Sequence, residues 1–348
     1  MVCASEHRSV SVVVGGAMSN SFLLWEKDIF CDPHMVFSDT SKDNIRDVSE
    51  IIAHQYSNFG RVINVSQSGA FEANSNNFLA KCTGGDIIVK KINALNRNVD
   101  FLIEQFRVAD TLYRCGISVP RIIRTDDANV FIQDESSIWC VLEFIDGRYL
   151  SGAEDEMISA IKLLDSTFLT LSGMSNAIKL PNMSLLGNAS PNVIRNLNAD
   201  AKIIDQLSII LDEICNNTIE LENLRGICHI DFHPHNLIIS NGKIFIIDFD
   251  AFMNAPIKSM LSFGALKLIR HAMAYRGNFD SELRDDLWEC FSKPNKHILS
   301  IRGEQAEVFR RLLSILDNTS PGNRSVWEKL IPVHVRCILE AEEIFYHG

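Results

Sequence analysis

The spacing of hydrophobic residues changes along the chain, and each change predicts a different kind of structure. Residues 41–57 and 98–115 carry apolar residues at helical spacing, which predicts two amphipathic helices. Between them, "RVINVSQ", "NNFLAKC" and "DIIVKKI" are short runs of β-forming residues, and only Thr83-Gly84-Gly85 separates the last two. We therefore expect an antiparallel meander with a helix on either side of it in the sequence.

The second half of the chain has a mainly helical pattern. Two more strand-like runs, "NVFIQ" and "SIWCVLEFI", lead to Asp146-Gly147, and helical periodicity then covers 154–172, 199–215 and most of 257–348. The pattern predicts an α+β, bilobal fold. A small antiparallel-sheet N-terminal lobe would span 1–145, with 1–57 as an N-terminal extension and helix, and a larger, mainly helical C-terminal lobe would span 146–348.

One β-rich segment, "HIDFHPHNLIISNGKIFIIDFD" at 229–250, interrupts the helical half. Asn241-Gly242 is a strong hairpin signal, because a two-residue type I′ turn needs positive φ at both central positions. Such a turn makes Ser240 the partner of Lys243, and it fixes the register of both strands.

This register brings polar residues together at the open end of the hairpin. It places Asn236 opposite Ile247, so Asn236 and Asp248 lie diagonally, about 7 to 8 Å apart at the backbone. Their hard oxygen atoms suit Mg²⁺, which usually accompanies phosphates. Asp231 can face the same end. One carboxylate to orient a hydroxyl and two oxygen ligands for a metal are the set that phosphoryl transfer requires.

These motifs also resemble those of a known superfamily. "HIDFHPHN" followed by "IIDFD" is similar to the HGDxHxxN and I-D-F/W motifs of the aminoglycoside phosphotransferase and choline kinase superfamily, small-molecule kinases with a protein-kinase-like fold. The upstream segments "IIVKKI", "IEQFRVADTLYRCGISVPRII" and "VLEFIDG" extend the resemblance to roughly residues 60–275. It implies transfer of the ATP γ-phosphate, with Mg²⁺, to a hydroxyl group.

Three roles in the chemistry follow from the resemblance. Asp231 would be the catalytic base, and Asn236 and Asp248 would be the Mg²⁺ ligands. Asp250 is expected to brace the loop.

The resemblance also implies the nucleotide-binding residues. Lys90 would contact the ATP phosphates with Glu104 as its partner, and we prefer Lys90 to Lys91 because strand alternation puts it on the same face as the preceding apolar residue. The hinge would contact adenine through the backbone of Glu143 and the following amides, up to Ile145.

Some positions depart from the superfamily pattern. Ile230 replaces the usual glycine, and His235 stands where glycine is common. The chain has no G-x-G-x-x-G, so the phosphate-covering loop is assigned to "QSGAFEANSNNF" at 67–78. The histidines at 229, 233 and 235 are expected to hold the catalytic loop through hydrogen bonds rather than to bind metal.

Composition and charge restrict the partners and the compartment. The chain has 348 residues, 46% of them hydrophobic, and a net charge of −11, without the basic patch that a nucleic-acid-binding protein needs. Nine scattered cysteines favour reduced thiols in the cytoplasm. We interpret "SVSVVVGGAMS" at 9–19 as a strand and turn, and we expect no membrane association.

Four functions remain open. The favoured one is a kinase for a small hydroxylated acceptor: an aminoglycoside, a choline-like amine, a sugar or a homoserine-like amino acid, with a slight preference for cationic alcohols. The alternatives are a protein kinase, a non-catalytic kinase-like protein that binds nucleotide, and a metal-dependent hydrolase that uses the three histidines. The sequence specifies no oligomeric state.

Overall fold

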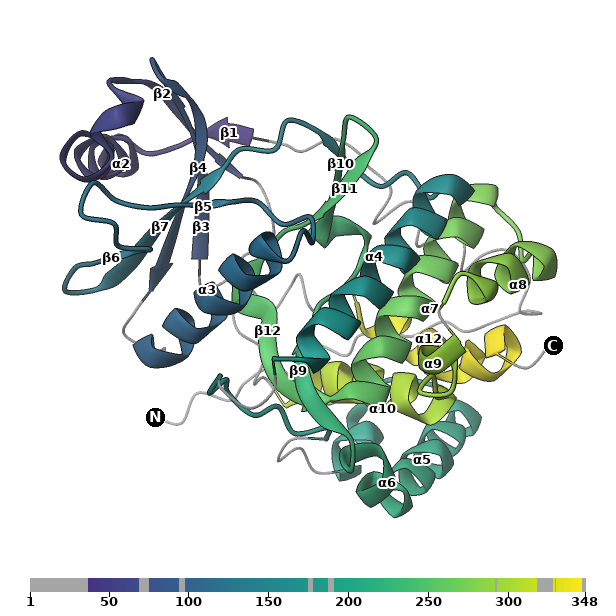
Figure 1. Cartoon of the computed structure of the whole chain (residues 1–348). Coiled ribbons are helices and arrows are strands. Elements are labelled where there is room, and N and C mark those ends of the chain that lie inside the picture. Colours follow the sequence, from purple (N-terminus) through teal and green to yellow (C-terminus); the bar gives the residue numbers. More distant parts are fainter. Residues whose placement is uncertain are drawn as a thin grey trace, which may run out of the picture.

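The computed structural model describes residues 37–68, 75–93, 98–174, 178–186, 191–291, 293–317, 328 and 330–345. The strand and turn predicted at 9–19 lie outside these residues. The fold has an antiparallel-sheet part followed by a helical part, so the predicted α+β class is confirmed (Figure 1).

The first part is built on an antiparallel sheet with strand order β1-β2-β3-β4-β7-β5, and β6 also pairs with β7. Its strands are β1 (Phe37–Asp39), β2 (Val62–Ser68), β3 (Ser75–Cys82), β4 (Gly85–Asn93), β5 (Ile122–Ile123), β6 (Ile132–Gln133) and β7 (Ser137–Glu143). The predicted meander is confirmed in β2, β3 and β4.

Two helices flank this sheet. Helix α2 (Lys42–Gln55) starts after Ser41, whose side chain accepts a hydrogen bond from the Asn44 amide, and it buries Val48 and Ile52 against the sheet. Helix α3 (Val99–Arg114) lies between the sheet and the helical part (Figure 1). Both helices were predicted, with ends that differ by one or two residues.

The strand predicted at 129–133 is shorter in the structure. Strand β6 begins at Ile132, because Asn129 closes a turn with Thr125 in which the Thr125 amide donates to the Asn129 carbonyl (2.9 Å). Ala128 within this turn has a φ of 66°.

The second part consists mainly of helices. These are α4 (Glu154–Ser172), α5 (Ala201–Asn216), α6 (Thr218–Glu222), α7 (Ile257–Arg276), α8 (Ser281–Glu289), α9 (Lys293–Lys296), α10 (Ile301–Leu316) and α12 (Ile331–Phe345). Two small sheets lie among them, β11-β10-β8 and β12-β9. Their strands are β8 (Arg148–Tyr149), β9 (Arg225–His229), β10 (Leu237–Ser240), β11 (Lys243–Ile246) and β12 (Phe252–Pro256).

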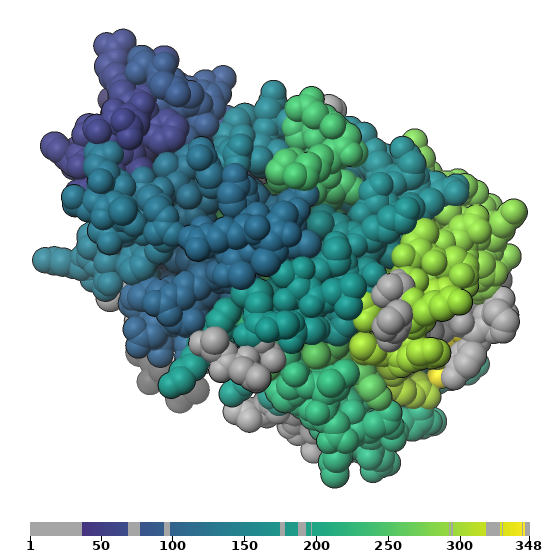
Figure 2. All heavy atoms as spheres, viewed as in Figure 1, coloured from purple at the N-terminus to yellow at the C-terminus, as the bar shows by residue number. Residues whose placement is uncertain are grey.

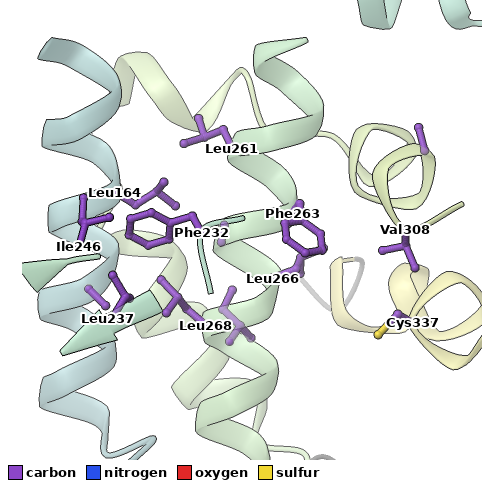
Figure 3. Packing of buried hydrophobic residues seen from close by; sticks show 14 of the residues in the cluster. Leu164, Phe232, Leu237, Ile246, Leu261, Phe263, Leu266, Leu268, Val308 and Cys337 are labelled. Carbon is purple, nitrogen blue, oxygen red and sulfur yellow. The ribbon is translucent and has the colours of Figure 1, made fainter. Parts of the chain in front are cut away.

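Helix α7 is the centre of the helical part, and nearly all of its residues are buried. In Figure 3, Phe232 lies between Leu164 of α4 and the residues of α7, and Phe263 points toward Val308 of α10. The segment after β9 is therefore anchored in the core immediately beside Asp231.

The two parts pack directly against each other. Helix α3 contacts both α4 and β12. In Figure 2, blue residues of the first part lie directly against teal residues of the second part. The hairpin β10–β11 lies at the surface beside this junction (Figure 2). Over the part of the chain that the structure describes, no helix is long and apolar enough to cross a membrane.

Gln105 links α3 to the helical part, and its replacement tests this link. Its side chain is only 4% exposed, and its Nε2 donates to the carbonyls of Asp250 and Phe252, both at 2.8 Å. We expect Gln105→Leu to lower the free energy of unfolding by roughly 2 kcal/mol, because two buried carbonyls lose their donor. Denaturant unfolding measures the effect. Glu104→Gln, one residue earlier, is the control and should change stability by less than about 0.5 kcal/mol; equal effects would contradict this role of Gln105.

His334 on α12 should make stability depend on pH. Burial, together with the nearby cations of Lys267 and Arg311, lowers its pKa from 6.5 to about 3. The unfolded chain therefore binds a proton at this histidine at a higher pH than the folded chain does. The stability that neutral His334 contributes is complete above pH 6.5 and is lost as the pH falls toward 3. Between pH 6.5 and 5, the free energy of unfolding should fall by about 2 kcal/mol less in His334→Asn than in the wild type. The exposed His54→Asn is the control, and unchanged pH dependence in His334→Asn would contradict the prediction.

Candidate active site

The hairpin that carries the predicted site forms with the predicted register. Asn241 and Gly242 have φ values of 50° and 73°, so both central residues of the turn adopt the left-handed conformation. Ser240 pairs with Lys243, as expected from a two-residue turn. The turn therefore fixes which residues meet at the other end of the hairpin.

At that open end, Asn236 and Asp248 come together. The Ile247 amide donates to the carbonyl of Asn236 at 2.9 Å, which continues the pairing by one step. Asp248 has a φ of 71°, an uncommon conformation that asparagine and aspartate tolerate better than other side chains. Asn236, Asp248 and Lys90 all line one cavity of about 120 Å³.

Lys90 reaches this cavity from strand β4. It is 3% exposed, and its Nζ lies 2.8 Å from Oδ1 of Asp248 and 2.5 Å from Oδ1 of Asp250. Lys91 points the other way, toward Asp47 at 3.3 Å. Strand alternation thus directs Lys90, and not its neighbour, into the cavity.

The donor set at the hairpin end fits a hard divalent cation. Asn236 uses its amide nitrogen to donate to Asp231, which leaves its side-chain oxygen as the atom suited to a metal. Two carboxylates, Asp248 and Asp250, face the single charge of Lys90. Burial and the adjacent Asp250 raise the pKa of Asp248 well above its usual value. A cation such as Mg²⁺ would relieve this repulsion through oxygen ligands that it prefers.

Asp231 lies in a different electrostatic environment. Its Oδ1 accepts from Nη1 of Arg311 at 2.8 Å, and its Oδ2 accepts from Nδ2 of Asn236 and Nε2 of His233, both at 3.1 Å. Although burial opposes ionisation, His233 and Arg311 hold the pKa of Asp231 well below its usual range. This aspartate is therefore anionic and fixed in orientation.

The histidines of the loop form hydrogen bonds within it. Nε2 of His229 donates to the Ile247 carbonyl (3.3 Å), and its Nδ1 accepts from the Asp231 amide (3.3 Å). Burial lowers the pKa of His229 to about 4, so the ring is neutral at pH 7. Nδ1 of His233 accepts from the amide of His235 (3.2 Å), which directs its Nε2–H to Asp231. At least two of the three rings thus hold the loop, as predicted.

The segment expected to act as the hinge, residues 143–145, also lines the cavity. Glu143 is the last residue of β7, and its amide donates to the Arg121 carbonyl at 2.9 Å. Glu143 and the buried Ile145 both line the cavity. Phe37, which the sequence did not suggest, also lines it and packs edge-on against Phe144 with ring centroids 6.4 Å apart. Further apolar lining comes from Ile88, Leu142, Ile238 and Ile247.

Lys90 forms ion pairs with Asp248 and Asp250, and its expected pairing with Glu104 stays a prediction. In this structure Glu104 pairs with Arg107 at 2.5 Å. The next residue, Gln105, faces inward and bonds the backbone beside Asp250. Adjacent positions on a helix differ by about 100° in direction, so the two side chains reach different surroundings.

The predicted phosphate-covering loop falls only in part on the described residues. Ser68 and Asn77, near its two ends, line the cavity, whereas residues 69–74 lie outside the description. Within the described ranges, no three His, Cys, Asp or Glu side chains gather to hold a metal ion.

Arg311 was not predicted from the sequence. This residue lies on α10, 80 positions after Asp231, and contacts it directly. The sequence signal was Arg310 and Arg311, three and four residues after Glu307, spacings that are common on helix surfaces.

Comparisons with known proteins identify the family of this chain. The model of the phosphotransferase enzyme family matches residues 70–258. The comparison with curated proteins gives no sequence match.

Solved structures of kinases share the fold at low sequence identity. An aminopropanol kinase associated with a microcompartment has a TM-score of 0.57 and 11% identity, covering 85% of this chain and 98% of its own. An amicoumacin kinase in complex with AMP-PNP and Ca²⁺ has a TM-score of 0.55 and 13% identity, covering 88% and 97%. A spectinomycin phosphotransferase in complex with ADP and spectinomycin has a TM-score of 0.53 and 16% identity, covering 86% and 98%.

The family match covers more than half of the chain, including the whole segment from Lys90 to Asp248. The resemblance inferred from the motifs is confirmed: this chain belongs to the phosphotransferase enzyme family.

Proposed function

We propose that this chain is a small-molecule kinase that transfers the γ-phosphate of ATP, with Mg²⁺, to a hydroxyl group. One observation carries the proposal: Asp231, Asn236 and Asp248 meet at one end of a hairpin, against the buried Lys90. This is the set of groups that phosphoryl transfer needs, because positioning and charge neutralisation supply most of its catalysis.

ATP would lie between the lobes formed by 1–145 and 146–348. The apolar lining at Ile88, Leu142 and Ile145 suits adenine, and the phosphates would extend toward Lys90. Asn236 and Asp248 would hold Mg²⁺. When bound, the ion would supply the positive charge that neutralises the phosphates and the charge that develops on the leaving oxygen.

Asp231 would orient the acceptor. Its depressed pKa makes it a weak base, so its main contribution would be to accept a hydrogen bond from the hydroxyl and to aim that oxygen at the γ-phosphorus. The oxygen attacks as the bond to the ADP oxygen breaks, and the hydroxyl proton leaves through Asp231.

The acceptor would be a small hydroxylated molecule. Spectinomycin, amicoumacin and aminopropanol appear in the names of proteins with this fold, which supports this class. We keep the slight preference for a cationic alcohol, and the scattered cysteines support a cytoplasmic location.

The alternatives have less support. A protein kinase usually has a long segment between the metal-binding aspartate and the next helix, whereas α7 begins at Ile257, nine residues after Asp248. A non-catalytic protein would not need Lys90, Asp231 and Asn236 in one geometry. A hydrolase would need the loop histidines as metal ligands, but His229 and His233 are already bonded within the loop.

Removal of Asp248 tests the metal site without knowledge of the acceptor. In calorimetric titrations, ATP should bind the wild-type protein in a Mg²⁺-dependent manner. Asp248→Ala should weaken this binding by about 10- to 100-fold, because a ligand of the ion is lost. Asp86→Ala, an exposed aspartate of β4, is the control and should bind like the wild type. Binding that is indifferent to both Mg²⁺ and Asp248 would contradict the proposal.

Asp231→Asn tests the role of the acceptor-orienting carboxylate. ADP release should first be screened with aminoglycosides, amino alcohols, sugars and hydroxy amino acids. With any acceptor found, Asp231→Asn should lower turnover by at least about 10³-fold, while calorimetry should show nearly unchanged MgATP binding. If turnover and ATP binding fell together, the assigned role would be wrong.

A further inference from the structure

Arg311 connects the C-terminal helices to the Asp231 loop by two parallel contacts. Its Nη1 donates to Oδ1 of Asp231 at 2.8 Å, and its Nη2 donates to the carbonyl of Ile230 at 2.7 Å. One planar guanidinium thus binds both the carboxylate and the backbone that carries it. Such a fork fixes direction as well as position, which an ammonium group could not do.

Arg311 is itself held in place by its surroundings. Its Nε donates to Oε1 of Glu307 at 2.7 Å, and its guanidinium lies 4.3 Å from the ring centroid of Phe263. The Glu307 side chain is fully buried (0% exposed) and also pairs with Arg310 through two contacts, at 2.7 and 2.8 Å. The arginine is therefore preorganised before any ligand binds.

Both oxygens of Asp231 are held by hydrogen bonds. Oδ1 accepts from Arg311, and Oδ2 accepts from Asn236 and His233. Because donors bind the carboxylate from both sides, its plane is fixed. Rotation of the carboxylate would break the contact with Arg311, so this arrangement resists it.

We propose that Arg311 is a positioning residue for phosphoryl transfer, which fixes the carboxylate of Asp231 in the orientation that receives the acceptor hydroxyl. The inference rests on the proposed function. It assigns to α10, outside the residues matched by the family model, a part in the reaction. Arg311 acts through Asp231 and contributes to turnover, not to nucleotide binding.

The neighbouring Arg310 provides a matched control. Both arginines bind Glu307, but of the two only Arg311 contacts Asp231. The probe is the MgATPase reaction with water as acceptor, followed by ADP release. We expect Arg311→Ala to lower kcat by about 100-fold at unchanged KM for MgATP, because small displacements of a reacting group cost about this much. Arg310→Ala should stay within about 3-fold of the wild type.

Two further measurements separate positioning from a purely structural role. Guanidinium ion at millimolar concentration should restore part of the kcat of Arg311→Ala but should have no effect on Arg310→Ala. Arg311→Lys, which keeps the charge and loses the fork, should retain the wild-type thermal midpoint within a few degrees and still lose about 10-fold in kcat. This variant decides the question if the alanine variant does not fold.

Three outcomes would overturn the inference. Equal kcat values in Arg311→Ala and Arg310→Ala, or a fully active Arg311→Lys that guanidinium does not affect, would show that Arg311 only supports the fold. In both cases an active wild-type enzyme would leave the proposed function standing. A wild-type protein that neither binds MgATP nor releases ADP would overturn the proposed function, and this inference with it.

Discussion

The buried ion pair of Lys90 with Asp248 and Asp250 is the constraint on which the site depends. It joins strand β4 to a segment about 160 residues later. Removal of a lysine from water costs several kcal/mol, and close carboxylates offset this cost only in good geometry. The sheet and the hairpin must therefore pack in one arrangement. Gln105 reinforces it, since it bonds the backbone at Asp250 and Phe252 from the same side.

Local signals in the sequence predicted the meander of β2, β3 and β4, the helices α2 and α3 and the hairpin β10–β11, but not the short strands β8, β9 and β12. The Asn241-Gly242 turn fixed the register that brings Asn236 to Asp248, because the φ requirement of two adjacent residues leaves few alternatives. Glu104 was named from the family resemblance alone. In the structure the next residue, Gln105, lies on the buried face of α3.

The contact of Arg311 with Asp231 could not be predicted in the same way. Its spacing from Glu307 is that of an ordinary surface pair, yet Glu307 is fully buried and Arg311 lies against Phe263. Which helix covers the Asp231 loop depends on how α7 and α10 pack, and this is decided by contacts between distant segments. Periodicity reports only that a face is buried, and it does not identify the neighbour.

The two central aspartates differ through their neighbours. Asp231 faces the cation of Arg311 and has a depressed pKa, whereas Asp248 shares Lys90 with Asp250 and has a raised one. As the proposed metal ligand, Asp248 would gain from a divalent cation, which would relieve its repulsion from Asp250. Asp231 is already neutralised by Arg311 and gains less from a metal. The charges around each carboxylate thus fit the roles proposed for them, metal binding for Asp248 and orientation of the acceptor for Asp231.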